Sequence, residues 1–329
     1  MSFELDLATG LLALLVFPGF AFLFVYGLTA EYLDRKLYAR LQNRVGPPPL
    51  QPLADFLKLL AKESAVPEGA TARIYNAAPW TGLAGVFTAM LYIPVWSERA
   101  AFAFEGDLVV VLFLLSLPSF SLFFGGWYSG NVFSRIGTTR TITQLFGYEI
   151  PFFLAAFAPA VAAGTLSTSG IAAFVAANPW YVAVLLPAFG VALLSLQAKL
   201  ERIPFDIPEA ETELATGALV EYSGRKLALF RLTKDVELVV GAALLSALFL
   251  GGPAPAGVLA GTAGLAAGVV VFLAKTLAVI ALLTVLKAVV ARLRIEQMVD
   301  VFYRVLVPVA LAQIALVLAV GLYTDGVIL

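Results

Sequence analysis

The sequence predicts an all-α polytopic membrane protein with about eight transmembrane helices. Of its 329 residues, 61% are hydrophobic and 13% are charged, whereas an ordinary soluble domain has about 45–50% apolar and about 25% charged residues. Apolar runs long enough to cross a bilayer recur along the chain, and cationic residues gather in alternate loops between them. We therefore expect a single membrane domain that covers residues 1–329.

Eight apolar runs account for the predicted transmembrane helices, because a span needs about 20 mostly apolar residues. No Lys or Arg precedes the first run, and no small-residue cleavage site follows it, so we expect a helix and not a cleaved signal peptide. Pro253 and Pro255 predict a turn between the sixth and seventh runs. The runs are residues 10–29, 78–97, 108–127, 143–164, 179–198, 236–253, 266–290 and 302–323.

The distribution of Lys and Arg predicts the orientation of these helices. Most of the cations lie in the odd-numbered loops, whereas the loops on the opposite side carry only Arg99. Since loops rich in Lys and Arg face the cytoplasm, we expect both termini on the outer face of the cell (cytoplasmic) membrane. The cations of the odd-numbered loops are Arg35, Lys36, Arg40, Arg44, Lys58, Lys62, Arg73, Arg135, Arg140, Lys199, Arg202, Arg225, Lys226, Arg231, Lys234, Arg292 and Arg294.

The first cytoplasmic loop, residues 31–76, contains an amphipathic segment. Its leucines follow the spacing i, i+3, i+7, i+10, and the charged residues fall on the other side. This spacing predicts a helix that lies along the membrane surface with one apolar face. The leucines are Leu50, Leu53, Leu57 and Leu60.

The third cytoplasmic loop, residues 199–235, is acidic. In a helical turn Asp206, Glu209 and Glu213 would share one face, and clustered carboxylates raise one another's affinity for protons. Alternatively, these acids belong to a solvated loop and pair with Arg202 and Arg225. The apolar residues among them indicate a loop folded back among the helices, although the sequence leaves open whether it re-enters the membrane. The acids are Glu201, Asp206, Glu209, Glu211, Glu213 and Glu221.

Two ionisable residues lie deeper, inside predicted spans. Glu149 falls in the fourth run and Lys275 in the seventh, whereas Lys287, nearer the cytoplasmic end, is expected to extend toward the surface. Charged groups inside a membrane are costly and usually face a partner or a water-filled path. Together with the acidic loop, they predict a route for protons from the cytoplasmic side toward mid-membrane.

Composition excludes several other functions. The chain has no Cys and no His, so it offers no thiolate for an iron–sulfur cluster and no imidazole for haem or zinc. Its net charge of −1 lacks the cationic excess typical of nucleic-acid binding. We expect no redox cofactor or metal to be bound by this chain alone.

Three blocks of sequence resemble the H subunit of bacterial complex I, the NADH:quinone oxidoreductase. They occur in the family's order, and the eight-helix plan agrees along essentially the whole chain. The blocks are Glu31–Lys36 with Gln42–Pro47 and Gln51–Asp55, then Pro204–Glu211 with Glu213 and Glu221–Ser223, and finally Arg292–Gln297.

The resemblance implies a membrane subunit that couples electron transfer to ion pumping. It implies hydrophilic iron–sulfur and hydrogenase-like large-subunit partners on the cytoplasmic face, and antiporter-like and small membrane subunits within the bilayer. The acids of the coupling path would be Glu149, Asp206, Glu209, Glu211, Glu213 and Glu221, to which we add Lys275. The docking platform or quinone-like chamber would use Glu31, Arg35, Gln42, Arg44, Asp55, Lys58, Arg202, Phe205, Arg225, Arg292 and Arg294.

Two departures from the respiratory pattern favour a particular branch. The stretch after Arg44 is short, and Lys234 stands where respiratory members generally have a glutamate. Both features, with the stretch from Glu221 to Leu232, resemble the membrane-bound [NiFe]-hydrogenase and sulfane-reductase branch. Iron–sulfur clusters and a [NiFe] centre, or a quinone, would then be held in or with the partner subunits.

Alternative functions remain open from the sequence. One is the quinone-binding membrane subunit of a respiratory NADH:quinone oxidoreductase. Another is a stand-alone proton-coupled secondary transporter, against which the lack of internal repeats counts. A third is a passive anchor whose acids only solvate the loop. The terminal electron acceptor and the transported ion, proton or sodium, cannot be read from the sequence.

Overall fold

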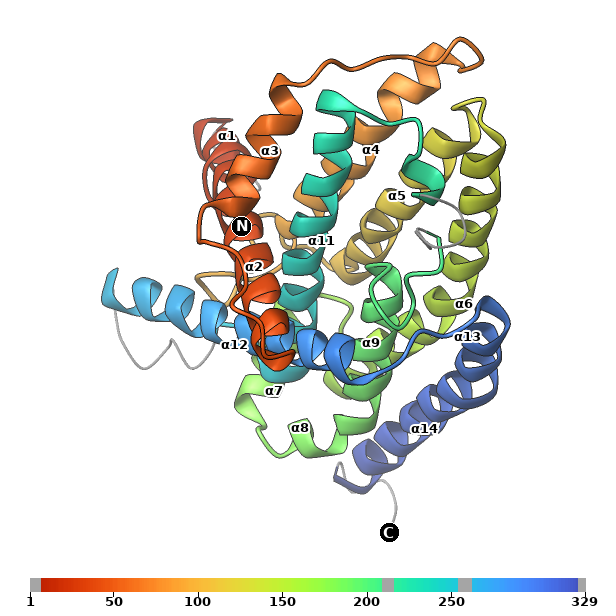
Figure 1. The fold of residues 1–329 in the computed structure, drawn as a ribbon. Helices are drawn as coiled ribbons and strands as arrows, with labels where there is room; N and C mark the ends of the chain where they lie inside the picture. The colour runs from red at the N-terminus through yellow and green to blue at the C-terminus, as the bar shows by residue number, and fades with distance from the viewer. Residues whose placement is uncertain (1–6, 209–215, 254–261, 325–329) are drawn as a thin grey trace.

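The computed structural model describes residues 7–208, 216–253 and 262–324, and within these ranges the chain is helical with no strand (Figure 1). The all-α fold class is therefore confirmed. The elements, in order, are α1 (Leu7–Leu15), α2 (Phe20–Leu41), α3 (Gln51–Ala61), α4 (Ala72–Met90), α5 (Asp107–Trp127), α6 (Val132–Ala163), α7 (Thr168–Ala177), α8 (Tyr181–Val184), α9 (Leu186–Lys199), the 3₁₀ helix η1 (Gly217–Leu219), α11 (Gly224–Leu250), α12 (Thr262–Val289), α13 (Ile295–Val301), the π-helical turn η3 (Phe302–Leu306) and α14 (Val307–Thr324).

Five stretches of the described chain are long and apolar enough to cross a membrane: Gly10–Leu41, Asp107–Trp127, Val132–Ala163, Ala266–Val289 and Ile295–Leu322. The protein is thus a multi-pass membrane protein. The other three predicted runs coincide largely with α4, α9 and α11. Of these, α9 has only 14 residues because the chain turns twice between α7 and α9. The total of eight spans and their orientation stay predictions.

Helix α11 forms the centre of the bundle (Figure 1). From Val236 to Phe249 every one of its side chains is buried, against α2, α4, α7 and α12. A helix that is apolar on all sides is stable only when neighbours surround it. The first half of the same helix carries Lys234, Asp235 and Glu237, so its central position brings charged groups into the interior.

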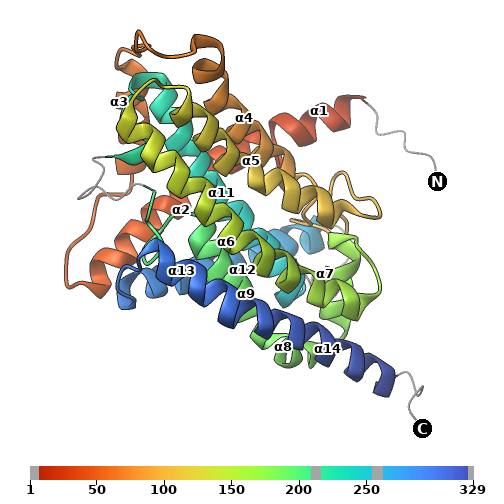
Figure 2. The same ribbon diagram turned by 90° about the vertical axis from the view of Figure 1, so that its right-hand side faces the viewer.

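Several long polar loops lie together on one side of the bundle, opposite α1, α7 and the end of α14 (Figure 2). Residues 42–50, 62–71 and 290–294 lie on the left in this view, together with α3. Helices α1 and α7 and the end of α14 lie on the right. We call the left side the loop face. It is the side predicted from its cations to face the cytoplasm.

The amphipathic helix is found where the leucine spacing placed it, as α3. Leu50 and Leu57 are exposed, as expected for residues that meet the membrane surface. The opposite side of α3 packs against the protein, where the Phe56 ring contacts the Phe24 ring with centroids 5.4 Å apart. Helix α3 therefore faces the protein interior with Phe56 and Leu59 and leaves Leu57 on its outer side.

Close helix contacts near the loop face depend on small residues. The Ser134 hydroxyl donates to the carbonyl oxygens of Gly126 and Ala218, each at 2.9 Å. This ties α6 to α5 and to η1. A methyl group on Gly137 would lie 2.6 Å from the backbone nitrogen of Ala218. Glycine at this position therefore allows the end of the acidic loop to lie directly on α6.

Replacing Gly137 with alanine is expected to destabilise the protein by about 1–3 kcal/mol, because the backbone of η1 must move to admit the methyl group. The unfolding temperature of the purified protein measures this loss. Gly190→Ala is the matched control, since its methyl group would meet no heavy atom within 4 Å, and alanine favours a helix over glycine. Equal unfolding temperatures for the two variants would contradict the expected strain.

Candidate functional site: a charged cavity and a buried polar chain

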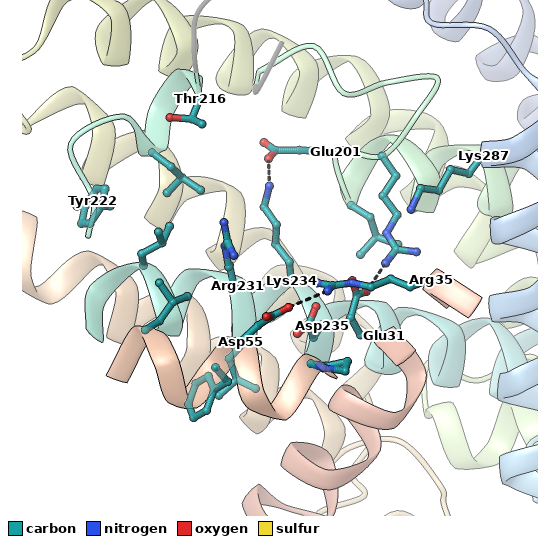
Figure 3. A pocket seen from close by; sticks show the side chains of 18 of the residues that line it. Glu31, Arg35, Asp55, Glu201, Thr216, Tyr222, Arg231, Lys234, Asp235 and Lys287 are labelled. Carbon is teal, nitrogen blue, oxygen red and sulfur yellow. Dashed lines mark hydrogen bonds and ion pairs between the residues drawn. The ribbon is translucent and has the colours of Figure 1, made fainter. Parts of the chain in front are cut away.

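A cavity of about 450 Å³ lies between α2, α3, α11, α12 and the segment after α9 (Figure 3). Nine of the 19 described residues that line it are charged, with both signs present, and most of the others are apolar. We call it the outer cavity. Its charged lining consists of Glu31, Asp55, Glu201 and Asp235 and of Arg35, Arg202, Arg231, Lys234 and Lys287.

On the α3 side, Arg35 connects two helices. Its Nε lies 2.5 Å from a Glu31 carboxylate oxygen one helical turn away, and its Nη1 lies 3.1 Å from Asp55 Oδ2 (Figure 3). The Gln51 amide donates to the other Asp55 oxygen at 2.8 Å. These contacts hold α3 across the mouth of the outer cavity.

On the opposite side, Arg202 lies between two acids of α2. Its Nη2 is 3.1 Å from Glu31 Oε2 and its Nη1 is 3.0 Å from Asp34 Oδ1. Burial alone would lower the pKa of the Arg202 guanidinium, but Asp34 and Glu31 raise it above its usual range. The guanidinium is thus a fixed positive charge, and it neutralises two buried carboxylates.

Asp34 also receives two groups from α12. Lys287 Nζ lies 3.2 Å from Asp34 Oδ2, and the Thr284 hydroxyl donates to Asp34 Oδ1 at 2.6 Å. The Asp34 side chain itself is fully buried. Lys287 therefore does not extend to the surface as expected, because a buried carboxylate offers it a closer partner.

A second cavity of about 20 Å³, the inner cavity, lies next to the outer cavity. At its outer side Lys234 Nζ is 2.8 Å from Glu201 Oε2. Further in, Lys199 Nζ lies 3.9 Å from Glu237 Oε1, and the side chains of this pair are only 2% and 3% exposed. Two pairs of opposite charge thus follow each other from the outer cavity into the bundle.

Polar groups continue from the inner pair toward the middle of α6. The Lys199 ammonium lies 5.2 Å from the centre of the Tyr148 ring, and the Tyr148 and Ser119 hydroxyls are hydrogen-bonded at 2.8 Å. One turn away on α5, the Ser116 hydroxyl donates to the Glu149 carboxylate. We call the whole series the polar chain: Glu201, Lys234, Lys199, Glu237, Tyr148, Ser119, Ser116 and Glu149.

The acidic loop is anchored at both described ends. At its start, the buried Gln144 amide donates to the carbonyls of Ala198 and Phe205, and the Phe205 ring packs edge-on against Phe302. This part of the loop is folded back among the helices. Glu209 and Glu213, which were expected to share one helical face with Asp206, lie outside the described residues, as does Glu211.

At its end, two tyrosines hold the loop. The rings of Tyr75 and Tyr222 stack with centroids 4.2 Å apart. The Tyr75 hydroxyl donates to the Glu221 carbonyl at 2.7 Å, and the Tyr222 hydroxyl donates to the Tyr75 carbonyl at 3.0 Å. Burial raises the pKa of Tyr222, with a further contribution from Tyr75, so this hydroxyl stays protonated and keeps its hydrogen bond.

The structure separates the predicted site residues into two groups. Glu31, Arg35, Asp55 and Arg202 line the outer cavity, and Glu149 ends the polar chain. The others lie elsewhere. Asp206 pairs with Arg292 at 2.6 Å, and the Glu221 carboxylate accepts a hydrogen bond from the Asn131 amide at 2.5 Å. Lys275 donates to the Leu250 and Gly252 carbonyls at the end of α11. The exposed residues are Gln42, Arg44, Lys58, Arg225 and Arg294.

Several residues at the centre of the site were not singled out from the sequence. Lys199 stands at the flank of one predicted span, and Glu237 stands at the start of the next one. A usable signal was present, because Lys234 and Glu237 are three residues apart in a helix and so lie on one face. The residues missed are Asp34, Lys199, Asp235 and Glu237, while Glu201 was noted only as an acid of the loop and Lys234 only as a departure from a family pattern.

The described side chains hold no group of three or more acidic residues arranged to bind a metal ion. What the arrangement offers is a series of carboxylates, ammonium groups and hydroxyls. Such groups bind and release protons, and ion pairs between them rearrange when one member is neutralised. The site is therefore suited to moving or storing charge.

Comparison with known proteins places this multi-pass helical bundle, with its charged cavity and polar chain, in one class of protein, the membrane subunits of complex I-related complexes. Residues 12–318 match the family model described as NADH dehydrogenase. The chain belongs to this family, that of the complex I H subunits.

Individual relatives agree with this assignment. The chain is 36% identical over 326 residues to the H subunit of NADH-quinone oxidoreductase from Frankia casuarinae, covering 94% of this chain and 72% of that protein. It is 36% identical over 315 residues to the H subunit of the same enzyme from Bacillus thuringiensis subsp. konkukian, covering 93% and 92%. A chain in the structure of the membrane-bound sulfane sulfur reductase, an archaeal respiratory membrane complex, matches with a TM-score of 0.79 at 28% identity, covering 90% of this chain and 96% of that one.

Proposed function

We propose that this subunit couples electron transfer in soluble partner subunits to ion translocation, in a complex of the membrane-bound hydrogenase type. The observation that carries the proposal is the polar chain from the outer cavity to Glu149. Charged groups within a membrane are costly unless they serve a pathway or a pairing. Here they follow one another from the loop face to the middle of a transmembrane helix.

The chemistry of the chain divides the work between subunits. With no Cys and no His, the protein offers no ordinary ligand for an iron–sulfur cluster or a [NiFe] centre. We place these centres in iron–sulfur and hydrogenase-like partners on the cytoplasmic side. Within the bilayer, changes of charge along the polar chain would be passed on to antiporter-like and small membrane subunits, which would move the ions.

The lining of the outer cavity favours the hydrogenase type. Sites for small organic molecules are mostly apolar with a few polar groups, whereas nine charged residues line this cavity. An apolar quinone tail would meet charged walls on several sides. A chamber of this kind suits water and exchangeable protons, so the electron acceptor would be protons or a sulfur compound at a partner subunit.

Activity assays of the purified native complex test this function. We expect hydrogen evolution or sulfur reduction with reduced electron donors, and ion uptake into liposomes that depends on that reaction. Quinone reduction without either activity would contradict the hydrogenase type. It would favour the second candidate, the quinone-binding subunit of a respiratory complex, which the 36% identity to membrane subunits of two NADH-quinone oxidoreductases supports.

A stand-alone transporter is tested by reconstituting the isolated chain in liposomes. On the proposed function the isolated chain should carry no ion or solute flux, because its polar chain ends at Glu149 and needs neighbouring subunits to continue. Substantial flux through the isolated chain would contradict the proposed function.

A further inference from the structure

Among the residues that the structure describes, three stand at the boundary between the outer cavity and the inner cavity. Leu200, Glu201 and Lys234 line both of them. Leu200 is 3% exposed and Glu201 8% exposed, and the Glu201 carboxylate is held by the Lys234 ammonium at 2.8 Å. One apolar side chain and one ion pair therefore stand between a large, open cavity and a small, buried one.

The backbone holds Glu201 at this boundary in an uncommon conformation. Its φ of 50° lies in the left-handed region, which costs a residue other than glycine about 1 kcal/mol or more. The conformation occurs directly after the end of α9 and directs the carboxylate toward α11 (Figure 3). Residues held in this region are often found at functional sites.

The inner cavity has room and a partner for a water molecule. Its volume of about 20 Å³ exceeds the roughly 10–15 Å³ that one water needs. Glu237 Oε1 is buried without a hydrogen-bond donor, since Lys199 at 3.9 Å is too distant to donate. An unpartnered buried carboxylate oxygen beside a space of this size is the environment that an ordered water occupies.

We propose that Leu200 and the Glu201–Lys234 ion pair form a gate between the outer cavity and a buried water site at Glu237. While both partners are charged, the pair holds the gate closed. Protonation of Glu201 from the outer cavity removes the negative charge that holds Lys234, and the side chains part. Water and a proton then pass Leu200 and reach Glu237. This inference rests on the proposed function and adds the place at which the entry of protons into the polar chain is controlled.

Cysteine accessibility tests the gate directly, because the chain has no cysteine of its own. Thr233 is 3% exposed and lines the inner cavity, and Thr216 is exposed and lines the outer cavity. Each is replaced by cysteine in the intact complex, and labelling of this chain by methyl methanethiosulfonate is followed by mass. Ser119→Cys, also at the inner cavity, is the second reporter if Thr233→Cys fails to assemble.

In the native background we expect the inner cysteine to react at least about tenfold more slowly than the Thr216→Cys control, because labelling requires a local opening. When Leu200→Ala or Lys234→Met is combined with the inner cysteine, its labelling rate should rise close to that of the Thr216→Cys control. Lys234→Arg keeps the positive charge, so labelling of the inner cysteine should stay slow. Equal rates in the native background would overturn the gate. So would an inner rate unchanged by both opening substitutions.

Labelling needs no turnover, so its outcome is independent of the proposed function. A complex that shows no redox-linked ion uptake would refute the proposed function and leave the labelling result to decide the gate. If uptake is present, Leu200→Ala should lower the number of ions moved per electron, because an open gate lets protons return. Unchanged coupling in a variant whose inner cysteine labels rapidly would contradict the role of the gate in coupling.

Discussion

Replacement of Arg202 by methionine is expected to destabilise the protein by about 3–5 kcal/mol, the usual cost of removing one partner of a buried ion pair. Methionine keeps much of the side-chain length but leaves Glu31 and Asp34 facing each other without the guanidinium between them. Lysine should restore only part of the loss, because one ammonium cannot match a planar group that contacts two carboxylates through two nitrogens. Unfolding temperature and urea midpoints in detergent measure the effect.

Arg292→Met is the matched control. Arg292 also pairs with an acid, Asp206, but its side chain is 43% exposed, and exposed pairs contribute about 0–1 kcal/mol. In the Arg202→Met protein, a further Asp34→Asn substitution should recover only part of the stability, because it removes one of the two carboxylates that Arg202 neutralised but also takes the carboxylate partner from Lys287. A loss from Arg202→Met no larger than that of the control would show that the two acids are not held charged by Arg202.

Replacing Glu149 with glutamine is expected to lower redox-driven ion uptake by at least about tenfold, since a positioned proton-transferring group typically contributes about 100-fold or more to a rate. The amide still accepts the hydrogen bond of Ser116, so packing is retained, but it cannot bind and release a proton. Liposomes that contain the complex and a pH-sensitive or sodium-sensitive dye measure uptake, and the redox rate is measured in the same preparation.

Glu105→Gln provides the comparison for this loss. Glu105 likewise accepts hydrogen bonds, from Thr165 and from the Leu166 amide, but it lies outside the polar chain. We expect uptake to be unchanged in that variant. If the Glu149→Gln complex takes up as many ions per electron as the native complex, ion transfer along the polar chain does not require the Glu149 carboxylate.

The sequence predicted the helices well and the site only in part. Arg35, Glu31, Asp55 and Arg202 were identified because they belong to motifs in polar loops, and the structure brings them to one cavity. Lys199 and Glu237 were missed, because each stands at the edge of an apolar run, where a charge usually marks only the membrane boundary. Their burial depends on the central position of α11, which no local pattern records.

Other differences have similar physical causes. The run 179–198 was expected to be one helix, but the structure divides it at Leu185 into the short helix α8 and α9. Lys275 was expected to take part in ion coupling, and its ammonium donates to carbonyls at the end of α11. A backbone partner of this kind comes from the packing of two helices, so residue type and spacing do not predict it.

The contacts between α2 and α12 bear on how the protein is made. Asp34 meets Thr284 and Lys287 across 250 and 253 residues of chain, and Tyr26 meets Thr276 across another 250. During synthesis the first helix must therefore enter the membrane long before its polar partners exist. A truncated chain that stops before α12 would hold the buried Asp34 carboxylate without these two partners. Completion of this pairing thus distinguishes a finished subunit, ready for assembly, from an unfinished one.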